Sequence, residues 1–233
     1  MPAIVDAACV RHWLGEVAAR LRAERAFLTQ LDAAIGDADH GVNMDRGFAA
    51  VLARTDGLDA AAPGQLLKAA GRTFVTTVGG AAGPLYGTAF LQAGEALGDE
   101  PEPGPRRLLH ALRAALDGVQ RIGAASEGDK TMVDALAPGL AAYAAALRDG
   151  GSLETAVRAA RAAAAEGMRA TIPLQARKGR AYYLGPRSVG HQDPGATSTA
   201  LMFAALEDAV LADRSQRFAA GLHGSARRSV GRR

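Results

Sequence analysis

Three aspartates stand close together in the segment LDAAIGDADHGVNMDRGF, residues 31–48: Asp32, Asp37 and Asp39. On an unbroken helix Asp32 and Asp39 share one face, while Asp37 points away. A bend at Gly36 would bring the three carboxylates together. Because like charges repel at short range, such a cluster is costly unless cations neutralise it. Oxygen ligands without cysteine favour Mg²⁺, Mn²⁺ or Ca²⁺ over zinc. The alternative to a metal site is a solvated helix cap that is rich in aspartate.

A calcium-binding EF-hand loop is excluded by spacing. Counted from Asp37, the sixth residue is Val42 and the twelfth is Phe48, where that loop needs Gly and Glu.

Glycines crowd the segment VGGAAGPLYGTAF, residues 78–90, just before a predicted helix. Backbone N–H groups at such a helix start can bind phosphate. A tight, closely packed turn between two helices is the alternative. A dinucleotide-binding fold is excluded because no G-x-G-x-x-G and no preceding strand are present.

The segment GAASEGDKTMVDALAP, residues 123–138, is not a P-loop. Asp129 stands between Gly128 and Lys130 and breaks the required G-K-[ST] order. The remaining pattern predicts a glycine-rich turn with Asp129 as a helix N-cap and Lys130 available for an anion.

Cations and tyrosines mix in residues 176–203, ARKGRAYYLGPRSVGHQDPGATSTALMF, a composition that suits a nucleotide. Arg177, Lys178, Arg180 and Arg187 supply charge, and Tyr182 and Tyr183 are candidates to flank a ring. A Ser188/His191/Asp193 hydrolase is disfavoured, because three residues so close in one loop rarely reach triad geometry and no G-x-S-x-G is present.

These segments interrupt a chain that predicts helix almost throughout. Alanine dominates the 48% hydrophobic fraction, and alternating strand patterns are scarce. Turn signals mark roughly eight helical stretches, namely 6–30, 41–57, 63–78, 84–97, 106–122, 129–150, 152 onward and 195 onward. A single all-α domain over residues 1–213 follows.

The last twenty residues, 214–233, predict a basic, flexible tail that accounts for much of the net charge of +3. A nucleic-acid-binding arm is the less favoured alternative, since Phe218 is its only aromatic residue. A single cysteine, Cys9, and no apolar run of about 18 residues predict a cytoplasmic protein.

Four motifs, IGDADHGVNM, GGAAGPLYGT, GDKTMVDAL and ARKGRAYYLG…GHQDPGATS, occur in an order that resembles the L subunit of dihydroxyacetone kinase. The resemblance covers about Trp13 to Val210. It implies a barrel of eight antiparallel helices with ADP or ATP capping one end.

The resemblance also implies the site residues. It places two Mg²⁺ on Asp32, Asp37 and Asp39. It assigns nucleotide contacts to His40, Gly41, Val42, Asn43, Ala81, Ala82, Gly123, Met132, Arg180, Asp193, Pro194 and Gly195. The family often carries a hydroxyl residue where this chain has Ala82, so weakened phosphate binding is expected.

By resemblance, the chain is expected to be a kinase subunit that is active only with partner subunits. A phosphotransferase-system donor subunit would rephosphorylate bound ADP, and the phosphate would pass to dihydroxyacetone on a substrate-binding subunit. One alternative is an ATP-exchanging kinase subunit for another small keto-sugar. The other is a nucleotide-loaded module that docks on a transcription regulator.

Overall fold

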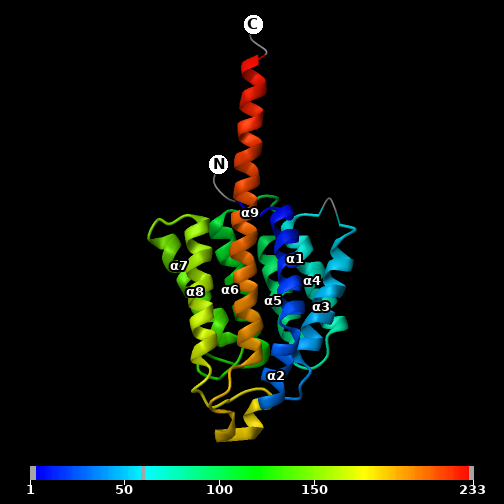
Figure 1. The fold of residues 1–233 in the computed structure, drawn as a ribbon, viewed down its shortest axis with the longest axis vertical. Helices are drawn as coiled ribbons and strands as arrows, with labels where there is room; N and C mark the ends of the chain where they lie inside the picture. The colour runs from blue at the N-terminus through cyan, green and yellow to red at the C-terminus, as the bar shows by residue number, and fades with distance from the viewer. Residues whose placement is uncertain (1–3, 59–60, 231–233) are drawn as a thin grey trace.

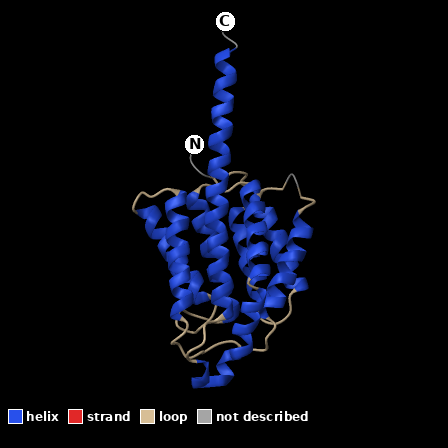
Figure 2. Cartoon of the chain, viewed as in Figure 1, coloured by secondary structure: helices blue, strands red, loops and turns tan. Residues whose placement is uncertain are grey.

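The computed structural model describes residues 4–58 and 61–230, with side-chain positions for all of these except Arg214 and residues 216–230. Every regular element in this part of the chain is a helix, which confirms the all-α prediction (Figure 2). The elements are α1 (Ala7–Ala23), α2 (Arg25–Ile35), α3 (His40–Thr55), α4 (Pro63–Thr77), α5 (Ala82–Leu97), α6 (Pro105–Gly123), α7 (Val133–Arg148), α8 (Leu153–Ala170), the 3₁₀-helix η1 (Arg180–Ser188) and α9 (Pro194–Val230).

The helices form a closed, antiparallel ring (Figure 1). From α3 to α9, each α-helix packs against the next α-helix in the chain, and α1 closes the ring by packing against both α9 and α3. With α1 and α2 counted as one broken element, this is the predicted eight-helix barrel.

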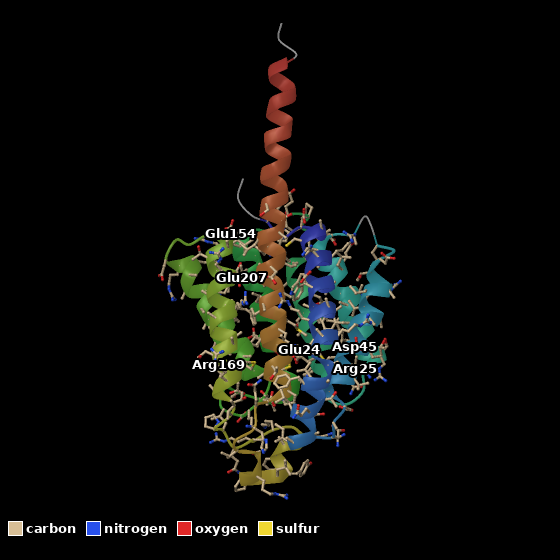
Figure 3. All side chains as sticks on the ribbon, viewed as in Figure 1. Glu24, Arg25, Asp45, Glu154, Arg169 and Glu207 are labelled. Atoms are coloured by element: carbon tan, nitrogen blue, oxygen red, sulfur yellow. The ribbon has the colours of Figure 1, made fainter. Side chains whose placement is uncertain are left out.

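The first predicted stretch, residues 6–30, is interrupted at one residue. Glu24 leaves helical geometry, with φ −92° and ψ 8°, and the chain then restarts as α2. Neither Gly nor Pro stands there, so the local sequence carries no break signal. The break lets α2 pack against α3, where Asp45 of α3 pairs with Arg25 of α2 at 3.7 Å (Figure 3). Asp45 also pairs with Arg22, near the end of α1, at 3.2 Å.

The barrel core combines aromatic rings with close backbone contacts. Phe48, Phe74 and Phe90 meet with ring centroids 5.0–5.9 Å apart. The pair α4 and α5 approaches closely because glycines face one another. A Cβ on Gly71 would lie 2.7 Å from the Gly87 carbonyl oxygen, so larger residues would separate these helices.

Helix α9 is longer than the barrel and continues past the end opposite its start (Figure 1). The prediction that residues 214–233 form a flexible tail stays a prediction; residues 214–230 form the last part of this helix. Their side chains, apart from Ser215, and residues 231–233 lie outside the described residues. No helix in the described part of the chain is long and apolar enough to cross a membrane.

Candidate functional site

A cavity of about 410 Å³ opens at the end of the barrel where α9 begins. All four glycine-rich segments contribute to its lining, through residues within 32–43, 79–86, 123–133 and 178–195. Helices α3, α5, α7 and α9 start at this end (Figure 1). The volume falls in the range of pockets that hold small molecules and cofactors.

Most of the site residues predicted from the sequence line this cavity. They are Asp32, Asp37, Asp39, His40, Asn43, Ala81, Ala82, Gly123, Met132, Arg180, Asp193, Pro194 and Gly195. Gly41 and Val42 lie outside the lining. Gly41 packs against α2, where an added Cβ would lie 2.1 Å from the Arg25 carbonyl oxygen.

The three aspartates meet at the turn between α2 and α3. One carboxylate oxygen from each of Asp32, Asp37 and Asp39 lies within 4.8 Å of the other two. Asp32 is buried, and its Oδ2 accepts hydrogen bonds from the backbone N–H of Asp39 at 2.8 Å and of His40 at 3.1 Å. The turn at Gly36 permits this arrangement, since a Cβ there would lie 2.0 Å from Asp32 Oδ1.

This oxygen cluster fits a hard divalent cation. Two oxygens on the same Mg²⁺ lie at most about 4.2 Å apart, because each is about 2.1 Å from the ion. The separations of up to 4.8 Å therefore require only a small closure of the Asp32, Asp37 and Asp39 carboxylates. Their chemistry selects Mg²⁺ or Mn²⁺ over zinc.

The start of α5 faces the same cavity. Gly79, Gly80, Ala81 and Ala82 line it, and Gly80 has a left-handed backbone with φ +64°. The first N–H groups of a helix have no partner within the helix and attract anions. This end of α5 is therefore suited to phosphate oxygens. The methyl side chain of Ala82 adds no hydrogen-bond donor.

A buried polar network supports the cavity wall and was missed by the sequence prediction. His40 Nε2 lies 2.9 Å from Ser198 Oγ, which lies 2.7 Å from the hydroxyl of Tyr86. Tyr86 also donates to the Gly195 carbonyl at 3.1 Å. Burial lowers the pKa of His40, although Asp32 and Asp39 raise it. Tyr86 and Ser198 lie inside the quoted motifs, but only the fold brings them together.

Asp129 and Lys130 have roles that differ from the prediction. Helix α7 begins at Val133, and Asp129 instead accepts from the Ser126 N–H at 2.8 Å, so the N-cap prediction is wrong. Lys130 is only 1% exposed, and its Nζ donates to the carbonyls of Thr171 and His191. Lys130 also lines the cavity, but two of the three N–H donors of its ammonium are used by backbone carbonyls rather than by an anion.

Asp134 and Asp193 order the loops beside Lys130. Asp134 accepts from the N–H groups of Gly128 at 2.6 Å and Thr131 at 2.7 Å. Asp193 accepts from the Ala196 N–H at 2.7 Å at the start of α9. Burial raises the pKa of Asp193 to about 7.

The paired tyrosines do not flank the cavity as predicted. Tyr182 and Tyr183 contact each other edge to face at 5.7 Å, and Tyr183 is 83% exposed. Neither lines the cavity, whereas their neighbours Arg180 and Ala181 do. The backbone turns within η1, so adjacent residues face different surroundings.

Strained backbone gathers at this end of the barrel. Among the described residues other than glycine, Ala38, Ala124 and Lys130 have positive φ, at 62°, 45° and 63°. All three lie in turns that border the cavity. Such conformations cost about 1–3 kcal/mol each and cluster at functional sites.

The chain is similar to known proteins over most of its length. Residues 34–208 match the DAK2 domain family. The chain is 42% identical over 191 residues to the ADP-binding subunit DhaL of the PEP-dependent dihydroxyacetone kinase of Escherichia coli (strain K12), covering 82% of this chain and 91% of that protein. It is 35% identical over 198 residues to the ADP-binding subunit DhaL of the PTS-dependent dihydroxyacetone kinase of Lactococcus lactis, covering 85% of this chain and 95% of that protein.

The fold also matches a solved structure. The dihydroxyacetone kinase of C. freundii in complex with AMP-PNP and Mg²⁺ superposes with a TM-score of 0.67 at 26% sequence identity. The match covers 89% of this chain and 35% of that longer chain.

Proposed function

Because this chain belongs to the DAK2 domain family and is a DhaL-type, ADP-binding subunit of a dihydroxyacetone kinase, we propose that it carries a phosphoryl group on Mg²⁺-bound ADP in the cavity at the end of its barrel. Asp32, Asp37 and Asp39 would hold two Mg²⁺. The start of α5 would bind the phosphates, and the walls around Met132 and Gly195 would hold the nucleoside.

One observation carries this proposal: the carboxylate cluster, the start of α5 and Arg180 all line one cavity. Phosphoryl transfer depends mainly on alignment and on neutralising charge on the transferred group. Bound Mg²⁺ would supply much of that neutralisation. The chain itself orients Asp32 through two backbone N–H groups and places N–H donors and a guanidinium around the same space.

The phosphate donor and acceptor lie on other subunits in this proposal. The phosphotransferase system would supply phosphate to bound ADP through a donor subunit. The phosphate would then pass to dihydroxyacetone on a substrate-binding subunit. The names of the E. coli and L. lactis relatives, PEP-dependent and PTS-dependent, support this route. Docking on a transcription regulator finds no support among these relatives.

The test is retention of ADP by the purified chain. We expect ADP to leave the protein on denaturation in about one equivalent, and to be lost when Mg²⁺ is chelated. Asp37→Ala and Asp39→Ala should abolish retention while far-UV circular dichroism stays unchanged. Asp117→Ala, an exposed aspartate on α6, is the matched control and should retain ADP. Unchanged affinity in the Asp37 and Asp39 variants would remove the site assignment.

The phosphate source is tested by reconstitution with partner subunits. Turnover of dihydroxyacetone should require the donor subunit and phosphoenolpyruvate, and added ATP should not replace them. Turnover with ATP alone would favour the exchanging version of the kinase. Phosphate release by this chain alone would contradict the carrier role.

A further inference from the structure

The loop that carries Arg180 is fixed at both ends. Lys130 Nζ donates to the carbonyls of Thr171 and His191, and the Gly190 N–H donates to the Ile172 carbonyl at 2.8 Å. These contacts close the neck of residues 172–190. A further bond, from the Arg177 N–H to the Asp129 carbonyl at 3.0 Å, ties the loop to the turn before α7. The backbone near Arg180 is therefore held beside the cavity.

From this position Arg180 reaches the aspartate cluster. Its Nη2 lies 2.9 Å from Asp37 Oδ2, and the two side chains are 65% and 35% exposed. Within the described residues, no other ion pair involves Asp32, Asp37 or Asp39. The guanidinium thus supplies the positive charge nearest to Asp37.

We infer that Arg180 is an exchangeable counter-ion, which pairs with Asp37 and moves to the nucleotide phosphates when a metal ion takes that carboxylate. The inference rests on the proposed function for the identity of the ligands. A metal ion that binds Asp37 competes with the guanidinium for the same carboxylate. Phosphate oxygens in the same cavity offer the planar guanidinium of Arg180 a bidentate partner of the kind it prefers.

Two opposite effects follow from this exchange. Arg180 disfavours metal binding in the absence of nucleotide, because the ion pair has to break. It favours metal and nucleotide together, because the released guanidinium finds a new partner. The two ligands therefore bind with positive coupling, which is reciprocal between them. Arg180 selects the metal–nucleotide complex over the free metal.

The experiment measures Mn²⁺ affinity by electron paramagnetic resonance on nucleotide-free protein, with and without added ADP. In Arg180→Gln, Mn²⁺ alone should bind about two- to fivefold more tightly, the range expected for loss of a largely exposed ion pair. ADP affinity in the presence of Mn²⁺ should fall about tenfold or more, because a charge-assisted hydrogen bond to phosphate is lost. By reciprocity, the gain in Mn²⁺ affinity caused by ADP should shrink by the same factor as the gain in ADP affinity caused by Mn²⁺, about tenfold when ADP binding without metal is unchanged.

Two control variants separate this role from general electrostatics. Arg187, which the sequence groups with the cations suited to a nucleotide, does not line the cavity. Arg187→Gln removes this exposed cation, which has no ion pair among the described residues, and it should leave Mn²⁺ affinity unchanged. Arg180→Lys keeps the positive charge, so Mn²⁺ alone should bind this variant about as weakly as it binds the unsubstituted chain.

The possible outcomes are distinct. Weaker Mn²⁺ binding in Arg180→Gln would mean that the guanidinium orients Asp37 for the metal, which overturns the inference. Unchanged binding, or an equal effect of Arg187→Gln, would overturn it as well. Failure of the unsubstituted chain to bind either Mn²⁺ or ADP would instead contradict the proposed function.

Discussion

Replacing Lys130 with Met tests how the loops around the cavity are held together. The substitution keeps an unbranched apolar stem and removes the ammonium. Lys130 Nζ donates to two backbone carbonyls that lie 41 and 61 residues further along the chain. The His191 carbonyl loses its only described donor, whereas the Thr171 carbonyl still accepts from the Leu174 N–H at 3.2 Å.

The expected loss of stability follows from these contacts. An unsatisfied buried carbonyl costs about 1–3 kcal/mol, and the part-buried His191 carbonyl falls at the low end of that range. Removing one partner from a buried charge cluster costs about 3–5 kcal/mol. Burial lowers the pKa of Lys130, while Asp193 and Asp134 raise it, so the ammonium itself carries a desolvation cost. Its removal offsets part of the loss. We expect the free energy of unfolding to fall by about 2–4 kcal/mol.

The assay is urea unfolding followed by circular dichroism at 222 nm. Lys68→Met on α4 is the matched control, because Lys68 is only half-buried and has no ion pair among the described residues. Tryptic cleavage within residues 177–187 should also be faster in Lys130→Met, because the two ends of this loop lose the hydrogen bonds from Lys130 Nζ. A free energy of unfolding within about 0.5 kcal/mol of the unsubstituted chain would refute this reasoning.

Four further predictions follow from single features of the structure. Gly36→Ala should abolish Mg²⁺-dependent ADP retention and leave the helical content unchanged, because the new Cβ would lie 2.0 Å from Asp32 Oδ1; circular dichroism and nucleotide release check both parts. Ala82→Ser should tighten ADP binding by about two- to tenfold through one added hydrogen bond to phosphate, as measured by calorimetry. Burial raises the pKa of Asp193 from 3.8 to about 7, so the folded chain retains a proton that the unfolded chain has released, and stability should fall as pH rises through that window. Asp193→Asn should flatten this slope in urea titrations of the nucleotide-free chain between pH 5 and 8. Deleting the residues after Asp213 should leave ADP affinity unchanged, because α9 leaves the barrel at the end opposite the cavity (Figure 1).

Much of the helical architecture could be predicted from the sequence. Ser152 stands before α8 and accepts from the Thr155 N–H at 3.3 Å, as its residue type predicts. Pro63 opens α4 at the position where proline fits a helix start. These signals act within a few residues of the chain, so they do not depend on the rest of the fold. The break at Glu24 has no such signal and could not be predicted.

Part of the candidate site could likewise be predicted from the sequence, and part could not. The chemistry of Asp32, Asp37 and Asp39 and the bend at Gly36 follow from residue types and spacing, and the structure brings the three carboxylates within 4.8 Å of one another. The placement of Lys130 could not be derived from its segment. Its segment predicted a glycine-rich turn with Lys130 available for an anion, but its hydrogen-bond acceptors lie in distant loops.

The sequence by itself determined the helices, the glycine-rich turns and the kinds of ligand those turns suit, because propensity, capping and side-chain chemistry are local properties. Only the tertiary structure decided which side chains share a space. Closure of the ring between α1 and α9 brings the four motifs to one end of the barrel. It pairs Arg180 with Asp37 and buries Lys130, while Tyr183 is left in solvent. Contacts between residues far apart in the chain depend on how whole helices pack, and no short segment encodes that packing.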